Sequence, residues 1–353
     1  MLVLLLLACK PEVDDSGTPA PVALDEAGPW RVGYRESAVI YADPDGEGER
    51  ALRLALWFPT EAEAGAEAKY MGAIDAPGVL ADPAPADGAF PLALFSHGHQ
   101  GYAENSSFLM VHLASHGFVV AAPDHTDNTF LDGSDRATEI YYQRPLDLSA
   151  VLDNLHGGGE EGITPAEDPV LLMGHSFGGY TAFALAGAAY DLETLAPACE
   201  SGTGPSAFCS TWSEAAEARF EAGFLDERVG ALLPMAPGDS DLFALGSLAE
   251  LEVPVLLMNG DLDGSTPTDG EDYWAALQGG PDRRVVIAGG GHQVFTDLSG
   301  VLDPQEGDID PEEGFRIVDA YALAWALRNL GDEAGASTLD GEEEVSASAT
   351  WSE

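Results

Sequence analysis

Short apolar runs bounded by turn residues recur along the chain and predict strands. Most are near-continuous runs of Val, Leu and Ala, which is typical of parallel strands buried on both faces of a sheet. Residues 30–58 instead resemble antiparallel edge strands. The other predicted strands cover residues 92–95, 118–122, 170–173, 229–235, 255–258 and 284–288.

Segments whose apolar residues recur at a spacing near 3.6 lie between these runs and predict helices. Because strand and helix alternate, the sequence predicts an α/β fold with a mostly parallel, doubly wound sheet in one domain over residues 29–330. Residues 191–228 break the alternation, and we interpret them as a lid or cap insertion over the site. The small, acidic residues 331–353 predict a disordered tail. The predicted helices cover residues 106–115, 145–155, 177–190, 213–224, 272–277 and 312–330.

The N-terminus is an apolar run that ends in Leu-Leu-Ala-Cys at residues 6–9. This matches the lipobox of bacterial lipoproteins, in which the signal is cut before a cysteine that then carries the lipid. The run is too short to span a membrane. No Lys or Arg precedes it, so a late start and an unusual signal both stay open. We expect a signal over residues 1–9, lipidation of Cys9, a flexible tether over residues 10–28, and a protein anchored or secreted outside the cytoplasm.

The charge balance is extreme. The chain of 353 residues carries 61 acidic and 14 basic residues, a formal net charge of −47. Such a chain is repelled by a phosphate backbone, which argues against nucleic acid as a partner. Adaptation to salt or to an exposed location and a bias of the genome both explain the acidity, and neither bears on the reaction.

Two further cysteines, Cys199 and Cys209, lie in a segment with the composition of a loop. Outside the cytoplasm they could form a disulfide. Two unrelated thiols are the alternative. Neither resembles a nucleophile, because no histidine lies close in sequence and the flanking residues are acidic.

The clearest chemical motif is Gly-His-Ser-Phe-Gly-Gly at residues 174–179, between a predicted buried strand and a predicted helix. This is the context that a G-x-S-x-G nucleophile elbow requires, because the glycines allow a sharp turn that exposes the serine hydroxyl. The motif predicts Ser176 as a nucleophile. The backbone N–H of Phe177, at a helix N-terminus, is then one donor to a developing oxyanion.

A carboxylate and a histidine follow in the order that such a triad requires. Residues 260–267 (Gly-Asp-Leu-Asp-Gly-Ser-Thr-Pro) follow a predicted strand, and their spacing favours Asp263 over Asp261 as the residue that orients the histidine. Asp239 and Asp241 are outside candidates. His292 follows three glycines after the last strand and is predicted to act as general base, then general acid.

A fourth element, Ser-His-Gly-His-Gln-Gly at residues 96–101, follows another predicted strand. In such enzymes this loop donates the second oxyanion N–H. His99 is the expected donor and Gln100 the alternative. A metal site at His97 and His99 is the competing interpretation, but no further ligand accompanies them at a suitable spacing. We expect no metal and no cofactor.

Together these stretches resemble the platelet-activating-factor acetylhydrolase and bacterial predicted dienelactone hydrolase branch of the α/β-hydrolases. Residues 95–98, 113–125 and 174–179 carry the resemblance, and residues 57–59 and 144–147 fit it. The segments around Asp263 and His292 are also similar to bacterial cutinase-type polyester hydrolases. The resemblance implies the α/β-hydrolase fold and metal-independent cleavage of carboxylic esters, often with short acyl groups. True dienelactone hydrolases use cysteine, so the serine departs from that activity.

We therefore expect a serine hydrolase that cleaves a small-molecule or lipid-like ester through an acyl-enzyme, with no nucleic-acid partner and membrane contact only through the lipid. The alternatives are a polyester or oxidised-phospholipid hydrolase and a non-catalytic surface binding protein on the same scaffold. The sequence specifies neither the natural substrate nor the oligomeric state.

Overall fold

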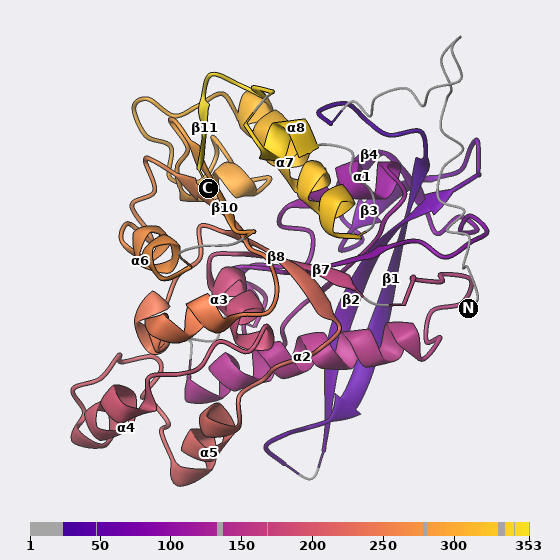
Figure 1. Cartoon of the computed structure of the whole chain (residues 1–353). Coiled ribbons are helices and arrows are strands. Elements are labelled where there is room, and N and C mark those ends of the chain that lie inside the picture. Colours follow the sequence, from indigo (N-terminus) through magenta and orange to yellow (C-terminus); the bar gives the residue numbers. More distant parts are fainter. Residues whose placement is uncertain are drawn as a thin grey trace, which may run out of the picture.

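The computed structural model describes residues 24–46, 48–132, 137–167, 169–277, 281–330, 336–341 and 343–352. At its centre, six neighbouring strands run parallel to one another (Figure 1). This confirms the prediction of a mostly parallel α/β sheet. The six strands are β5 (Leu92–Ser96), β6 (Val119–Pro123), β7 (Val170–His175), β8 (Val229–Met235), β9 (Leu256–Gly260) and β10 (Arg283–Ile287).

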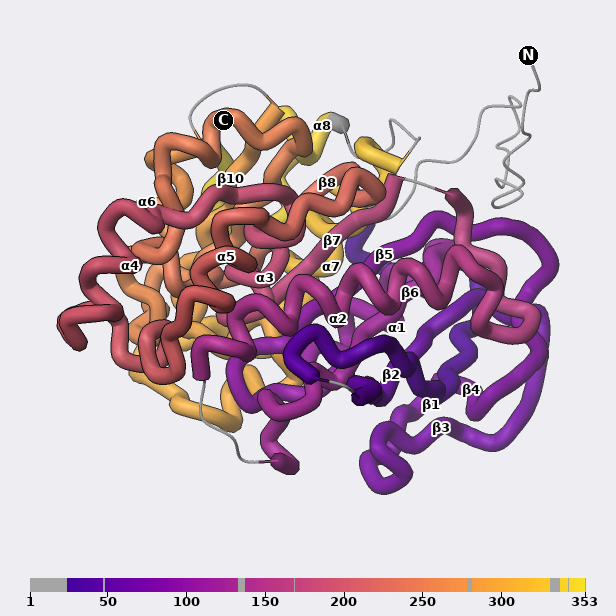
Figure 2. Tube along the Cα trace, turned by 90° about the horizontal axis from the view of Figure 1, so that it is seen from below, coloured from indigo at the N-terminus to yellow at the C-terminus, as the bar shows by residue number. Residues whose placement is uncertain are grey.

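Further strands, joined mostly by antiparallel pairing, extend the sheet at both ends. The strands β1 (Arg31–Ala42) and β2 (Glu49–Thr60) pair antiparallel, and β2 joins the parallel strands through β6. Beyond them lie β3 (Glu67–Tyr70) and β4 (Ile74–Ala81), and at the other edge lies β11 (Ala349–Ser352). Among these described outer strands, only β1 and β4 pair in parallel. The complete order is β11-β10-β9-β8-β7-β5-β6-β2-β1-β4-β3, and Figure 2 shows β1–β4 gathered at one end of it.

Helices cover both faces of the sheet, and the sheet separates two hydrophobic cores. Along β7, Val170 and Leu172 pack into one core, whereas Leu171 and Met173 pack into the other. Each of these four residues therefore meets apolar neighbours, which explains the continuous apolar run at residues 170–173. The helices α2 (Thr138–His156), α3 (Phe177–Leu185) and α6 (Asp269–Ala276) cover the first face. The second face carries α1 (Ser107–Ser115) and α7 (Pro311–Leu330).

The helix boundaries that differ most from the sequence prediction are those of α2 and α3. The helix α2 begins at Thr138 and continues through Pro145, because Ile140, Tyr141 and Tyr142 bury their side chains in the core. The helix α3 ends at Leu185 rather than at residue 190, near Gly187, whose φ of +94° a helix cannot accommodate. No helix in the described ranges is long and apolar enough to cross a membrane.

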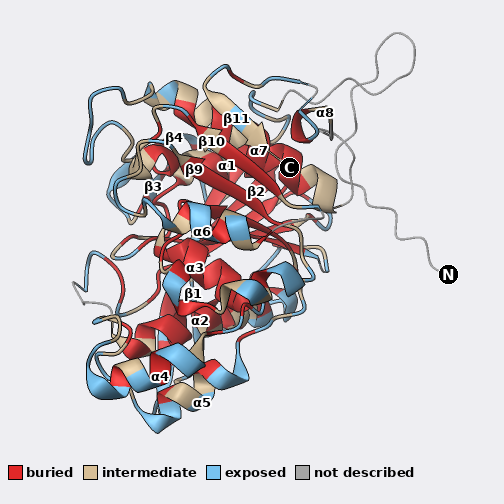
Figure 3. Ribbon diagram, turned by 60° about the vertical axis from the view of Figure 1, so that its left-hand side comes forward, coloured by how far each residue is buried: buried red, intermediate tan, exposed pale blue. Residues whose placement is uncertain are grey.

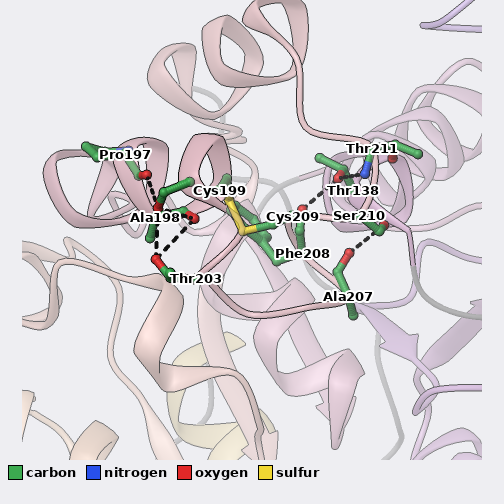
Figure 4. The surroundings of a disulfide bond; sticks show 11 residues. Thr138, Pro197, Ala198, Cys199, Thr203, Ala207, Phe208, Cys209, Ser210 and Thr211 are labelled. Atoms are coloured by element: carbon green, nitrogen blue, oxygen red, sulfur yellow. Dashed lines mark hydrogen bonds between the residues drawn. A yellow bond between two sulfur atoms is a disulfide. The ribbon is translucent and has the colours of Figure 1, made fainter.

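Residues 191–228 form α4 (Leu192–Ser201) and α5 (Glu214–Ala222), which expose much of their surface at the periphery (Figure 3). A disulfide between Cys199 and Cys209 confirms the predicted pairing. Thr138 of α2 fastens the segment, because its hydroxyl donates to the carbonyl of Phe208 (2.6 Å) and accepts from the N–H of Thr211 (3.0 Å; Figure 4).

The described residues near both ends of the chain are more ordered than the sequence predicts. The predicted disordered tail instead contains α8 (Ala336–Leu339) and β11, which pairs with β10 from residue 349 to residue 352. The predicted signal, Cys9 and most of the tether lie outside the described residues. The last part of the tether is not free, since the backbone oxygen of Leu24 bonds to His112 (3.0 Å) and Gly28 N–H donates to Ser115 (2.8 Å).

Candidate active site

Ser176 occupies a strained turn between β7 and α3. Its φ is 56° and its ψ is −119°, a conformation that a non-glycine residue rarely adopts. The flanking glycines allow this turn, because a Cβ at Gly174 would lie 2.1 Å from the carbonyl oxygen of Gly178, and a Cβ at Gly178 would lie 1.9 Å from that of Ser96. The geometry is that of a nucleophile elbow, with the serine at the carboxyl end of a central parallel strand.

Asp263 and His292 form a hydrogen-bonded pair. The Nδ1–H of His292 donates to Oδ2 of Asp263 over 2.8 Å, and the hydroxyl of Thr266 donates to the same oxygen over 2.8 Å. Burial alone would raise the pKa of Asp263, but the bonds from His292 and Thr266 outweigh it and lower that pKa to about 2. The carboxylate therefore stays ionised and fixes the His292 tautomer, with Nε2 free to accept a proton.

His175 brings the elbow and the histidine loop together. Its Nε2–H donates to the backbone oxygen of His292 over 2.9 Å, and the two ring centroids are 4.8 Å apart. Burial lowers the pKa of His175 to about 3, so the ring is neutral. Within the described chain no hydrogen bond joins the Ser176 hydroxyl to the His292 ring, and such bonds often tighten only when substrate binds.

An open cleft of about 530 Å³ contains Ser176. The Phe177 and His99 side of the cleft carries the two predicted oxyanion donors, and its other walls come from the segments after β8 and β9. None of residues 191–228, all of which are described, lines it. The segment predicted to be a lid therefore does not line this cleft, and the hydrogen bonds of Thr138 hold it beside α2 instead. The lining residues are His99, Ser176, Phe177, Gly238, Asp239, Ser240, Asp241, Ser265, Thr266, Thr268, Asp269 and Asp272.

The loop that carries His99 passes directly against the serine. A Cβ at Gly98 would lie 3.3 Å from the Ser176 Cβ, so a larger residue there would be tightly packed against the serine. The His99 ring is held by Asn128, whose amide nitrogen lies 2.9 Å from His99 Nδ1. Gln100 follows with a φ of 51°. The structure thus brings the Ser176 elbow and the predicted oxyanion loop together.

A buried arginine anchors this loop from behind. Arg144 of α2 is wholly buried, and its guanidinium donates to the carbonyl oxygen of His97 and to the Ser96 hydroxyl (2.9 Å). It also donates to Oδ1 of Asn128 (2.8 Å), the residue that holds the His99 ring. Its Cζ stands 4.7 Å from the centroid of the Phe177 ring. One side chain therefore contacts both segments that carry the predicted oxyanion donors.

A second Ser–His–Asp arrangement lies beneath the loop. Nδ1 of His125 is 2.8 Å from Asp147, and its Nε2 is 2.9 Å from the Ser96 hydroxyl. All three side chains are fully buried, and burial holds the pKa of His125 well below its usual value. Because none of these residues lines the cleft, this arrangement supports the loop and does not present a nucleophile.

The other residues that the sequence offered as candidates are Asp261, Asp239, Asp241 and His97. Asp261 accepts from the N–H of Gly289 over 2.7 Å, as a turn residue does, while Asp239 and Asp241 line the cleft. His97 uses both ring nitrogens on the backbone: Nδ1 bonds the Gly98 oxygen and Nε2 accepts from the N–H of residue 125. That arrangement leaves no nitrogen on His97 for the metal that was the competing interpretation.

Three contributors to the site were missed from the sequence: Thr266, Arg144 and His175. The Asp-Gly-Ser-Thr segment that ends at Thr266 contains a signal, since an aspartate often accepts from residues two and three positions ahead. The role of His175 depends on its bond to the backbone oxygen of His292, 117 residues away, which the motif does not show. The partners of Arg144 are distant in sequence, so no local pattern reveals them.

Comparisons with known proteins find similarity to chlorophyllases over part of the chain. The chlorophyllase family model matches residues 67–199, a stretch that includes Ser176 but neither Asp263 nor His292. Chlorophyllase-2 of Arabidopsis thaliana is 34% identical over 104 residues, 28% of this chain and 30% of that protein. Chlorophyllase type 0 of Chenopodium album is 34% identical over 105 residues, 28% of this chain and 29% of that protein. The chain thus matches under a third of the length of these curated relatives.

The fold extends the likeness to nearly the whole chain. A ferulic acid esterase from Streptomyces cinnamoneus superposes with a TM-score of 0.66 at 21% identity, over 95% of this chain and 98% of that one. At this identity the likeness shows the fold alone. With the strand order, the serine elbow and the family match, it confirms the fold expected from the sequence. The chain belongs to the α/β-hydrolase superfamily.

Proposed function

We propose that the protein is a carboxylic-ester hydrolase with Ser176 as its nucleophile. The observation that carries the proposal is the strained Ser176 elbow at the wall of an open cleft. The hydrogen-bonded pair of Asp263 and His292 supports it, and so do the similarities to chlorophyllases and to a ferulic acid esterase. Membership in the platelet-activating-factor acetylhydrolase-like branch stays a prediction from the sequence.

The chemistry is that of acyl transfer. The Ser176 hydroxyl attacks the ester carbonyl and passes its proton to Nε2 of His292, and Asp263 stabilises the imidazolium that forms. The N–H groups of Phe177 and His99 donate to the oxyanion. The alcohol leaves with the proton from His292, and a water molecule then hydrolyses the acyl-enzyme with His292 as base.

Replacing the nucleophile tests this proposal. Ser176→Ala is expected to lower turnover of p-nitrophenyl acetate by at least ~10³-fold and to abolish labelling by a fluorophosphonate probe. Ser210→Ala is the matched control, because Ser210 is exposed just after the disulfide-bonded Cys209 and its hydroxyl donates to the nearby backbone oxygen of Ala207. Unchanged turnover in Ser176→Ala contradicts the mechanism, and a wild-type protein that the probe does not label favours a non-catalytic binding role.

The substrate we propose is a short-acyl or lipid-like ester. A panel of p-nitrophenyl esters of increasing chain length separates these classes, because a lipid-like preference raises kcat/KM with chain length. A maximum at two to four carbons, roughly the reach of a small acyl pocket, favours the short-acyl class. Polyester and oxidised-phospholipid substrates are tested beside the panel.

We also propose that the protein is lipid-anchored outside the cytoplasm. The Leu-Leu-Ala-Cys sequence at residues 6–9 supports this, and the disulfide between Cys199 and Cys209 fits an oxidising compartment. Expression in bacteria with a radiolabelled fatty acid is expected to label the wild type and not Cys9→Ala. Equal labelling of the two proteins contradicts the proposal.

A further inference from the structure

The segment that carries His292 is fastened at both of its ends. It covers residues 292–297, and we call it the general-base segment. At its start, the backbone oxygen of His292 accepts the bond from His175, the residue before the proposed nucleophile. At its end, Asp297 contacts the beginning of α1, 190 residues away in the sequence. The general-base segment therefore links the serine elbow to α1.

The described first turn of α1 contains no side chain that caps it. Ser106 occupies the N-cap position, but its hydroxyl accepts no bond from the helix and instead donates to the backbone oxygen of Phe295 over 2.7 Å. The turn also contains no acidic residue. Because the first N–H groups of a helix have no partner within the helix, α1 needs an acceptor from elsewhere in the fold.

Asp297 supplies that acceptor. Its Oδ2 accepts from the backbone N–H of Ser107 (2.9 Å) and from the Ser107 hydroxyl (2.6 Å), and its Oδ1 accepts from the N–H of Phe108 (3.3 Å). In return, the N–H of Asp297 donates to the backbone oxygen of Asn105 over 2.9 Å. The helix dipole also favours a carboxylate at this position. Together with the bond from Ser106, these contacts join the end of the general-base segment to the beginning of α1.

The beginning of α1 continues directly from the predicted oxyanion loop, and the chain between them is itself held firmly. After His99, the N–H of Ala103 donates to Asp124 over 2.7 Å. The buried carboxylate of Glu104 accepts two bonds from Arg53 of β2, over 2.6 and 2.7 Å. The contacts at the start of α1 therefore tie the general-base segment to the chain that carries the predicted oxyanion donor.

We infer that Asp297 is a positioning residue of the reaction, which holds the general-base segment in the place relative to the oxyanion loop that acyl transfer requires. The inference rests on the proposed function, because it concerns the general base of the Ser176 site. Asp297 acts through the backbone of its segment and takes no part in bond making. The effect on rate is large, because a displacement of about 1 Å between reacting groups lowers the rate ~10²-fold.

Two replacements of Asp297 test the inference. Asp297→Ala removes both carboxylate oxygens and is expected to lower kcat for p-nitrophenyl acetate ~10²-fold. KM is expected to change less than about threefold, because the general base acts in the transition state and does not bind the ground state. Asp297→Asn is expected to restore kcat to within about tenfold of wild type, since an amide oxygen in the place of Oδ2 still accepts both bonds from Ser107.

Asp191→Ala is the matched control. Asp191 also caps a helix, because its side chain accepts from the N–H of Thr194 in α4, but it does not line the cleft. Loss of a cap is expected to lower the Tm of both alanine variants, whereas only Asp297→Ala is expected to lose kcat. Ser106→Ala is a milder variant of the same attachment, which removes the bond to the Phe295 oxygen and is expected to lower kcat about tenfold.

Three results overturn the inference and leave the proposed function intact: a folded Asp297→Ala protein with wild-type kcat, an equal loss of kcat in Asp191→Ala, or no gain of kcat in Asp297→Asn over Asp297→Ala. If Asp297→Ala does not fold, Ser106→Ala decides, and wild-type kcat in that variant overturns the inference. Undiminished turnover in Ser176→Ala overturns the proposed function, and this inference with it.

Discussion

Replacing Arg144 with methionine would show how far the predicted oxyanion loop depends on a buried guanidinium. Methionine keeps an unbranched, apolar stem of similar length and removes every N–H donor. Four acceptors lose the arginine: the carbonyl oxygen of His97, Oδ1 of Asn128, and the hydroxyls of Ser96 and Thr181. The Ser96 hydroxyl keeps its bond to His125, and the Thr181 hydroxyl keeps its bond to the Phe177 oxygen.

The size of the effect follows from these contacts. A buried acceptor without a partner costs about 1–3 kcal/mol, and two acceptors, the His97 oxygen and Asn128 Oδ1, are affected in this way. Part of the cost is offset, because the variant no longer pays the desolvation penalty of a buried guanidinium. We therefore expect Arg144→Met to lower the free energy of unfolding by ~3 kcal/mol. Asn128 also holds the His99 ring, so a displacement of about 1 Å at the His99 N–H is expected to lower kcat ~10²-fold. KM changes less, because the oxyanion forms only in the transition state.

The assay combines urea unfolding with the kcat and KM for p-nitrophenyl acetate. Arg219→Met is the matched control, since Arg219 also contacts an aromatic ring, that of Tyr142 at 5.1 Å, but lies in α5 outside the cleft. Arg144→Lys is expected to fall between wild type and Arg144→Met, because an ammonium cannot reproduce the planar fork. A folded Arg144→Met protein with wild-type kcat would refute the reasoning, as would equal loss of kcat in the control.

Two further predictions concern the triad and the disulfide. Asp263→Asn is expected to lower kcat for p-nitrophenyl acetate by roughly 10⁴-fold, through the wrong His292 tautomer. The pKa of the Asp263 carboxyl is lowered from 3.8 to about 2, so the ionised group stabilises the fold above about pH 4 and this contribution is lost as pH falls toward 2. Across this interval, the Tm of Asp263→Asn is expected to change less with pH than the Tm of wild type. Parallel curves of Tm against pH would contradict this expectation. Cys199→Ser/Cys209→Ser is expected to lower the free energy of unfolding, measured in urea, by roughly 2–3 kcal/mol. Its kcat is expected to be unchanged, because neither cysteine lines the cleft. A large loss of kcat in the folded variant would show that the segment reaches the site.

The central strands and the elbow could be predicted because their constraints are local. The first four residues of β7, Val170 to Met173, are buried on both faces of the sheet, so they form a continuous apolar run. The turn at Ser176 requires glycine on both sides, since a Cβ at either position would overlap backbone atoms. Where geometry excludes all other residues from a short segment, a short motif is informative.

The support behind the predicted oxyanion loop could not be inferred from the sequence, because its members come from distant parts of the chain. Asp147 is bound by Arg50 from β2, by Tyr41 from β1 and by His125 after β6. No periodicity brings those residues together. Pro145 even misled the prediction, since proline favours a helix N-terminus, whereas tertiary packing extends α2 seven residues upstream of it.

The acidic tail shows why a net charge is a poor guide to order at a particular segment. Composition predicts disorder for residues 331–353, yet Asp340 lies 3.0 Å from Arg328 and 3.5 Å from Arg283. The Arg283 guanidinium also stands over the ring of Trp351, in the strand that pairs with β10. In a chain with 61 carboxylates and only 14 basic residues, each arginine becomes a point at which acidic segments can attach. The order of a segment then depends on whether its carboxylates reach one of these few cations, which is decided by the fold and not by composition.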